Sequence, residues 1–174
     1  IENKKAFLAQ SKDFSFGARK ITSNKTELII LFIGESARAD HFGLNGYKRA
    51  TTPLLSNQKN LINFSNHCSQ ASHTLRSLPM ILTRATPADY ELAFKEKSLI
   101  YAFKEAEFKT YWISNQPDYV FFDETDYNEN RSFEADVKTS CATLSCDDAQ
   151  LIEDFSYYLA RIEKGSKNLF IIHG

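Results

Sequence analysis

The chain has 174 residues, 43% of them hydrophobic and 14 of them phenylalanine, which is enough to bury one core and too few for two ordinary domains. Its formal net charge is −1 and its Lys and Arg residues are spread along the sequence, so we expect no nucleic-acid partner. The longest apolar run, residues 28–33, is far shorter than the roughly 20 residues that a membrane-spanning helix needs, so we expect the chain itself to be soluble.

Residues 1–26 mix Lys, Asn and Ser with isolated Phe and have little periodicity, so we interpret them as a lead-in segment that packs on a domain over residues 27–174. Residues 27–33, which are apolar from Leu28 onward, predict a strand buried on both faces of a parallel sheet. Thr52 and Pro53 are typical of the N-cap and first residue of a short helix, which we expect to end near Gln58.

Residues 61–64 predict a second, shorter strand, and a helix is expected to begin near Thr74. The apolar positions of residues 98–106 indicate a helix, and the strand predicted for residues 110–113 follows it. Residues 118–139 are acidic and aromatic without a clear period, which indicates a long surface excursion.

The last helix is expected to begin at a capping box formed by Ser145 and Asp148 and to end at Gly165, after which residues 168–172 predict an apolar strand. The alternation of strands and helices predicts an α/β fold with a mostly parallel sheet flanked by helices. In such sheets, ligands bind beyond the carboxyl ends of the strands.

Three polar residues follow predicted strands on this reading: Glu35, Thr74 and His173. Each also has an ordinary structural interpretation, as a solvated loop carboxylate, a helix N-cap and a hydrogen-bonded histidine, respectively. Their common position beyond the strands makes them candidates for one site.

The sequence motifs around these three residues are more specific than their positions after predicted strands. Gly34-Glu-Ser-Ala-Arg-Ala-Asp-His-Phe-Gly-Leu-Asn-Gly-Tyr-Lys-Arg-Ala-Thr-Thr-Pro-Leu55 closely resembles the opening block of the phosphoethanolamine transferases, in the alkaline phosphatase and sulfatase superfamily. Thr74-Leu-Arg-Ser-Leu-Pro79 resembles their nucleophile segment, and Tyr111-Trp-Ile-Ser-Asn-Gln116 and Leu169-Phe-Ile-Ile-His173 resemble later landmarks. The resemblance implies an alkaline phosphatase/sulfatase-like fold, of which this chain is the incomplete, N-terminal part of the catalytic domain.

The resemblance also implies roles for single residues. Glu35 and Thr74 would be ligands of zinc, of which the complete domain would hold one ion or two, and Thr74 would also be the nucleophile. A threonine hydroxyl is a poor nucleophile unless its pKa is lowered, which coordination to a divalent cation achieves. His173 would hold the substrate phosphate or a second metal. Asn115 and Gln116 would line an ethanolamine pocket, although Asn-Gln-Pro is equally an ordinary turn signal.

The activity implied is transfer of phosphoethanolamine from phosphatidylethanolamine to a cell-surface lipid or glycan, as in lipopolysaccharide modification, through a threonine-linked intermediate. The family is anchored in the inner membrane by residues that precede this domain, so the resemblance implies the periplasmic face of that membrane. Cys141 and Cys146 resemble a short-range disulfide pair of the family, whereas their spacing alone fits a bonded or a reduced pair; Cys68 stands apart.

The family supplies two further metal ligands, an Asp-His pair, beyond the position of Gly174. We therefore expect this chain alone to bind zinc weakly or not at all and to be inactive. Two alternatives stay open: a sulfatase-like hydrolase of phosphate or sulfate esters, and a non-catalytic binding domain that lacks the full metal site. The sulfatase alternative is disfavoured because the frame C/S-x-P-x-R is absent at Thr74-Leu-Arg-Ser77.

Overall fold

The computed structural model describes residues 11, 13–116, 135–140 and 147–174. The chain forms two compact units: unit 2 is Gly34–Ser69, and unit 1 is the chain before and after it. Unit 2 contains the short helices η1 (Ala39–His41), η2 (Gly43–Asn45) and α2 (Pro53–Ser56). Unit 1 contains the strands β1 (Glu27–Ile33), β2 (Lys109–Ser114), β3 (Val137–Ser140) and β4 (Lys167–His173), and the helices α3 (Thr74–Leu82), α4 (Leu92–Lys95), α5 (Leu99–Glu105) and α6 (Asp148–Leu159).

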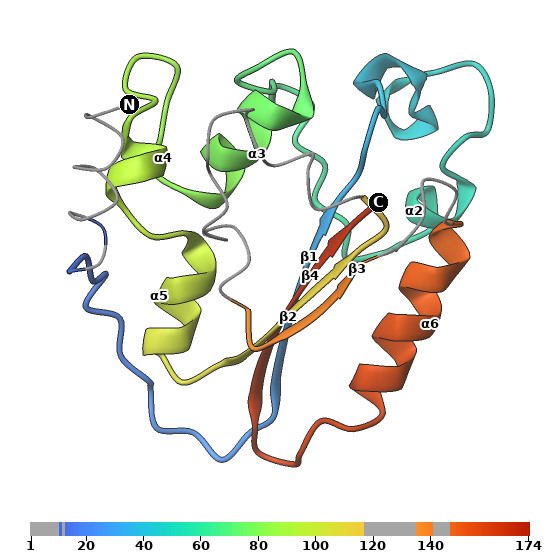
Figure 1. Ribbon diagram of the computed structural model, residues 1–174. Coiled ribbons are helices and arrows are strands. Elements are labelled where there is room, and N and C mark those ends of the chain that lie inside the picture. The colour runs from blue at the N-terminus through green and yellow to red at the C-terminus, as the bar shows by residue number, and fades with distance from the viewer. Residues whose placement is uncertain (1–10, 12, 117–134, 141–146) are drawn as a thin grey trace. The chain divides into compact units, whose positions relative to one another are not determined.

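The four strands of unit 1 form one parallel sheet in the order β1-β4-β2-β3, with helices on both of its faces (Figure 1). This architecture confirms the predicted α/β fold with a parallel sheet flanked by helices. The predicted strands at residues 27–33, 110–113 and 168–172 and the predicted helices at Pro53, Thr74 and residues 98–106 are all present.

Strand β4 is buried along its whole length, and its alternating side chains supply two separate cores. Leu169 and Ile171 face one side of the sheet, where they pack with Leu78 of α3 and Ile100 of α5. The intervening residues of β4 face the other side and pack with Leu151 of α6. Because side chains alternate along a strand, one apolar run builds both layers.

The prediction that residues 27–33 are buried on both faces was wrong. Strand β1 lies at the end of the strand order and pairs only with β4 among the described residues. Leu28, Ile30 and Phe32 are 41%, 47% and 59% exposed. An apolar run indicates the surroundings that a strand favours, but it does not determine how many neighbours the strand has.

Four other sequence predictions were wrong in detail. Residues 61–64 form no strand, and β3 begins inside the segment, residues 118–139, that was predicted as a surface excursion. Helix α6 is capped by Asp147, whose side chain accepts a hydrogen bond from the Ala149 backbone N–H, and it ends at Leu159, well before Gly165. Ser145, the predicted cap, lies outside the described residues, as do Cys141 and Cys146.

The lead-in segment contacts α5 through one carboxylate. The backbone N–H groups of Phe16 and Ala18 donate to the two oxygens of Glu105, at 3.0 Å and 2.9 Å. These bonds hold the described part of the lead-in against unit 1.

Asp136 holds β3 next to β2. Its Oδ2 accepts hydrogen bonds from the backbone N–H and the hydroxyl of Thr110, at 2.9 Å and 3.0 Å, and its Oδ1 lies 3.2 Å from Lys104 Nζ. Partial burial raises the pKa of Asp136, but the bonds from Thr110 and Lys104 together outweigh it, so this pKa lies below its usual value.

Replacement of this carboxylate should therefore cost stability in a pH-dependent way. A depressed pKa stabilises the fold above the unfolded pKa of about 4, and this contribution is lost as the pH falls through the folded pKa. We expect Asp136→Asn to lower the urea midpoint at pH 7 and to differ less from the unsubstituted chain at pH 3. The exposed Glu163→Gln is the charge-matched control, and a pH-independent deficit in Asp136→Asn would contradict this role.

Candidate functional site

Thr74, the predicted nucleophile, is the first residue of α3 and is half-buried. The helix is fixed to the sheet by Leu78 and Leu82, which are 1% and 2% exposed and belong to the same core as Trp112 and Ile171. Thr74 thus occupies the amino end of a helix that is packed on the sheet through Leu78 and Leu82.

Pro79 lies inside α3 and explains a contact that supports this helix. Proline has no backbone N–H, so it cannot donate to the carbonyl four residues earlier, that of Leu75. The hydroxyl of Tyr90 donates to that carbonyl at 3.3 Å. The guanidinium of Arg76 lies over the Tyr90 ring, 5.0 Å from its centroid. Tyr90 therefore braces the first turn of α3, which includes Thr74.

His173 ends β4 and is fully buried. Its Nδ1 lies 3.4 Å from the hydroxyl of Ser114, the last residue of β2. The His173 carbonyl accepts a hydrogen bond from the Asn115 backbone N–H at 3.1 Å. The structure therefore brings His173 and the predicted turn residues together at the carboxyl edge of the sheet.

Asn115 and Gln116 are held by structural contacts. Asn115 Nδ2 donates to Asp148 Oδ1 at 2.6 Å, which ties the end of β2 to the first turn of α6. The Gln116 backbone N–H donates to the Ser114 hydroxyl at 3.0 Å. These contacts agree with the turn interpretation of Asn115-Gln116, and their predicted role in an ethanolamine pocket stays a prediction.

Glu35 follows β1 after Gly34 and belongs to unit 2, whereas Thr74 belongs to unit 1. Ser36 adopts a left-handed backbone conformation with φ 53°, which few residues other than glycine adopt, and its hydroxyl donates to Glu35 Oε1 at 2.9 Å. The turn after β1 is therefore sharp, and it holds the carboxylate next to a hydroxyl. The meeting of Glu35 and Thr74 at one cation stays a prediction.

Unit 2 is held together by side chain to backbone hydrogen bonds. Thr51 Oγ1 donates to the His41 carbonyl at 2.6 Å and accepts from the Gly43 backbone N–H at 2.9 Å. Thr52 precedes α2 as predicted, but its hydroxyl accepts from the Leu44 backbone N–H, at 3.1 Å, and does not cap α2. Hydroxyl groups thus fix the turns of this unit.

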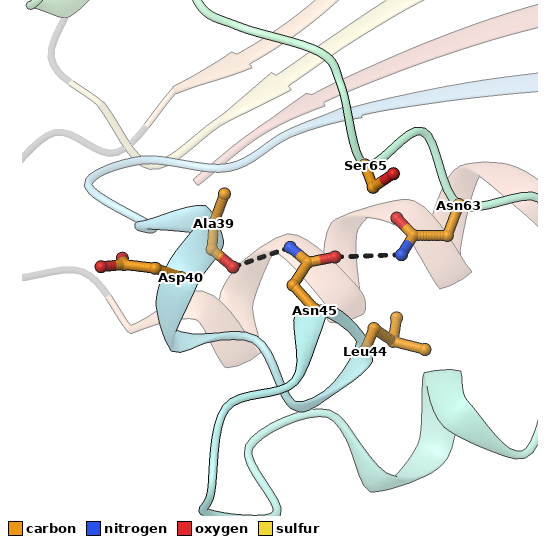
Figure 2. Close-up of a pocket in the computed structure, with 6 residues that line it drawn as sticks. All are labelled: Ala39, Asp40, Leu44, Asn45, Asn63 and Ser65. Atoms are coloured by element: carbon orange, nitrogen blue, oxygen red, sulfur yellow. Dashed lines mark hydrogen bonds between the residues drawn. The ribbon is translucent and has the colours of Figure 1, made fainter.

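A cavity of about 430 Å³ opens in unit 2 (Figure 2). Asn45 spans it: Nδ2 donates to the Ala39 carbonyl at 2.7 Å, and Oδ1 accepts from Asn63 Nδ2 at 3.0 Å. The full lining consists of Ala39, Asp40, Leu44, Asn45, Asn63 and Ser65. None of the five residues that the sequence analysis predicted for the site lines this cavity.

Asp40 is the charged group of this cavity. Arg38 donates to both of its carboxylate oxygens, at 3.0 Å and 2.6 Å. The hydrogen bond from Arg38 lowers the pKa of Asp40 below its usual value. The carboxylate is therefore ionised at neutral pH and already paired, so what the cavity offers a ligand is mainly neutral amide and hydroxyl groups.

The predicted metal ligands supply oxygen donors, the carboxylate of Glu35 and the hydroxyl of Thr74, and both types of oxygen occur as ligands of zinc and other divalent cations. Among the described residues, no three His, Cys, Asp or Glu side chains gather as a metal site. Cys68 is a free, exposed thiol. The chemistry of the two predicted donors fits zinc, but a tetrahedral site needs about four ligands.

Three residues that shape the site were missed by sequence reasoning: Ser114, Tyr90 and Asp148. Ser114 ends β2, so its position beside His173 could be inferred only once the sheet order was known. Tyr90 lies in a segment without clear periodicity. Asp148 was predicted only as a member of the capping box of the last helix, and its bond to Asn115 was not foreseen.

Residues 27–173 match the protein family described as Sulfatase. The phosphoethanolamine transferase EptC of Escherichia coli K12 is 34% identical over 99 residues, which cover 55% of this chain and 17% of that protein. The Kdo(2)-lipid A phosphoethanolamine 7''-transferase of Salmonella typhimurium is 30% identical over 149 residues, which cover 83% of this chain and 26% of that protein.

The similar solved structures are also of phosphoethanolamine transferases. The C-terminal periplasmic domain of EptC from Escherichia coli superposes with a TM-score of 0.75 at 27% identity, over 89% of this chain and 44% of that one. A zinc complex of the same domain superposes with a TM-score of 0.72 at 25% identity. The chain thus spans less than half of that solved domain and a smaller share of the curated relatives.

The contact between Asn115 and Asp148 leads to a testable expectation. A hydrogen bond to a charged group at a partly exposed position contributes about 1 kcal/mol. We expect Asn115→Ala to lower the free energy of unfolding by that amount, and the double variant with Asp148→Ala to lose less than the sum of the two single losses. Urea denaturation checks this. Gln116→Ala keeps the backbone N–H that bonds Ser114 and serves as the control; strict additivity would show that the contact contributes nothing.

Proposed function

Because the chain belongs to the sulfatase family, we propose that it carries part of a site that transfers phosphoethanolamine from phosphatidylethanolamine to a cell-surface lipid or glycan, such as lipopolysaccharide. The proposal is carried by the position of Thr74 at the amino end of a helix that is packed on the sheet. The amino end of a helix has a partial positive charge, which favours an approaching phosphate. The names of the relatives support the choice of phosphoethanolamine.

The reaction would run in two steps. In the first, Thr74 Oγ attacks the phosphorus of phosphatidylethanolamine, the bond to the glycerol oxygen breaks, and diacylglycerol leaves with the proton that the threonine gives up. In the second, an acceptor hydroxyl attacks the same phosphorus, the bond to Thr74 breaks, and the hydroxyl of Thr74 regains a proton. Each step exchanges one phosphorus–oxygen bond for another.

Zinc, when bound, would lower the pKa of a coordinated hydroxyl and offset charge on the phosphoryl oxygens. In this proposal, Glu35 and Thr74 hold the cation, and the bond from Ser36 orients the Glu35 carboxylate. His173 binds the substrate phosphate or a second metal, and its ring is positioned by Ser114. Asn115 and Gln116 would contact the ethanolamine group in addition to their structural contacts.

The proposed location is the periplasmic face of the inner membrane, with a membrane anchor outside this chain. The solved EptC relative is described as a C-terminal periplasmic domain, which supports it. Within the described part of the chain, every helix is too short or too polar to cross a bilayer.

A hydrolase is the second candidate, because the matching family is described as Sulfatase. In that case water would accept the group in the second step. The sequence Thr74-Leu-Arg-Ser77 lacks the sulfatase frame and favours transfer. The products distinguish the two: free phosphoethanolamine or sulfate indicates hydrolysis, and a modified lipid indicates transfer.

The nucleophile is tested in a protein that continues this chain with the rest of a family catalytic domain. We expect Thr74→Ala to reduce transfer to a lipid acceptor by about three orders of magnitude or more, since the first bond can no longer form. Mass spectrometry should find the phosphoethanolamine adduct on Thr74 in the unsubstituted protein. Thr83→Ala, at the other end of α3, is the matched control. Retained transfer by the Thr74→Ala protein would exclude Thr74 as the nucleophile.

Zinc affinity tests the proposed ligands without an activity assay. We expect titration calorimetry on the 174-residue chain to detect weak zinc binding or none, because the two predicted donors are only half of a tetrahedral set. In the complete domain, binding should be tight and should weaken in Glu35→Ala, whereas Glu163→Ala should leave it unchanged. Tight, stoichiometric binding by the chain alone would contradict the expectation.

A further inference from the structure

The cavity of unit 2 contains hydrogen-bonding groups that its own contacts leave open. Asn63 Nδ2 donates to Asn45 Oδ1 at 3.0 Å, and this is the one hydrogen bond of the Asn63 side chain within the described part of the chain. The Ser65 hydroxyl makes none with the described residues. A side-chain amide has two N–H donors and two lone pairs, and a hydroxyl has one donor and two lone pairs. The Asn63 carbonyl, its second N–H and the Ser65 hydroxyl are therefore available to a ligand.

The contacts of Asn45 hold this polar surface in a fixed orientation. Asn45 Nδ2 donates to the Ala39 carbonyl at 2.7 Å, while its Oδ1 accepts from Asn63. Figure 2 shows Asn45 between Ala39 and Asn63, with Ser65 beside Asn63. A site whose groups are already oriented loses less entropy when it binds a ligand. The cavity thus presents a small, preformed set of amide and hydroxyl groups.

The cavity offers little to a charged ligand. Among the described residues that line it, Asp40 alone is ionised, and Arg38 donates to both of its carboxylate oxygens. In Figure 2 this carboxylate points away from Asn45, Asn63 and Ser65. An anion would therefore meet no unpaired cation in the described lining, and a metal ion would meet a single carboxylate that is already paired. The lining favours a neutral ligand.

The open groups suit the adjacent hydroxyls of a sugar ring. A sugar hydroxyl both donates and accepts hydrogen bonds, and the amide of Asn63 accepts through Oδ1 and donates through Nδ2 in one plane. Two neighbouring hydroxyls can therefore bond the same amide. The Leu44 side chain also lines the cavity and supplies an apolar surface for the C–H face of a ring. A purely apolar ligand would instead displace water and leave the amides unpaired, which is unfavourable.

We propose that this cavity binds a sugar ring, whose hydroxyls bond the amides of Asn45 and Asn63 and the hydroxyl of Ser65. Its volume of about 430 Å³ lies within the range of small-molecule sites. Glu35 belongs to the same unit, and we assign the sugar to the acceptor, which would then be a glycosylated lipid. Only this assignment to the acceptor rests on the proposed function; the sugar site itself rests on unit 2 alone.

The test is an NMR titration of the 174-residue chain with methyl glucoside, a neutral sugar without a lipid chain. We expect the side-chain amide signals of Asn45 and Asn63 to shift and to saturate. For a ligand of about a dozen non-hydrogen atoms, the dissociation constant should be on the order of 1 mM. Cyclohexanol, a six-membered ring with a single hydroxyl, and inorganic phosphate should both bind about fivefold more weakly or not at all.

Substitutions test the residues one at a time. Asn63→Ala and Ser65→Ala should each weaken the binding of methyl glucoside about fivefold, the effect of one lost hydrogen bond. Both positions are exposed, so the backbone amide signals of unit 1 should stay in place in these variants. Asn60→Ala is the matched control, because Asn60 is an exposed asparagine of the same unit that does not belong to the described lining, and binding should be unchanged.

Three results would each overturn the sugar site: shifts that do not saturate, equal binding of cyclohexanol or phosphate, and undiminished binding by the Asn63→Ala chain. Octyl glucoside below its micelle concentration tests the source of the sugar. It should bind at least as tightly as methyl glucoside, and clearly weaker binding would overturn the assignment to a lipid acceptor. The Thr74→Ala chain should bind methyl glucoside as the unsubstituted chain does, so failure of the transfer proposal and failure of the sugar site are separable.

Discussion

The pairing of β4 with β1 on one side and with β2 on the other sets the register on which the polar edge of the sheet depends. In this register Ile33, His173 and Ser114 lie in one row across the three strands. Strands β1 and β2 therefore end at the same edge of the sheet as His173, and the polar residues that follow them begin there. A one-residue slip would move the side chain of His173 to the other face and separate it from Ser114.

The sequence predicted best where a strand is buried and continuous. Strand β4 was found within one residue at each end, because its apolar run is bounded by polar residues. Strand β3 was missed, since its four residues Val-Lys-Thr-Ser carry almost no apolar signal and are fixed by Asp136 and by pairing with β2. Residues 61–64 were predicted as a strand from apolarity alone, and a strand also needs a pairing partner, which no local pattern reveals.

For the candidate site, the sequence identified the groups that follow the strands but not the residues that hold them. His173 was found because it ends an apolar strand, and Ser114 was not, because the adjacency of β2 and β4 is a property of the sheet order. Asn115 illustrates the opposite case: a residue singled out for substrate binding has a clear structural bond to Asp148. Local patterns identify chemical groups, and contacts between distant segments assign their partners.

The position of β1 at the end of the strand order bears on the proposed chemistry through Glu35. This residue follows β1 after a single glycine, and the hydroxyl of Ser36, in the left-handed turn next to it, donates to its carboxylate. A catalytic constellation has to be held within about 0.5 Å of its working geometry by the surrounding packing. Among the described residues β1 pairs on one edge alone, whereas β4, which ends at His173, pairs on both edges. The position of Glu35 therefore depends more on the turn that follows β1, and the position of His173 more on the sheet itself.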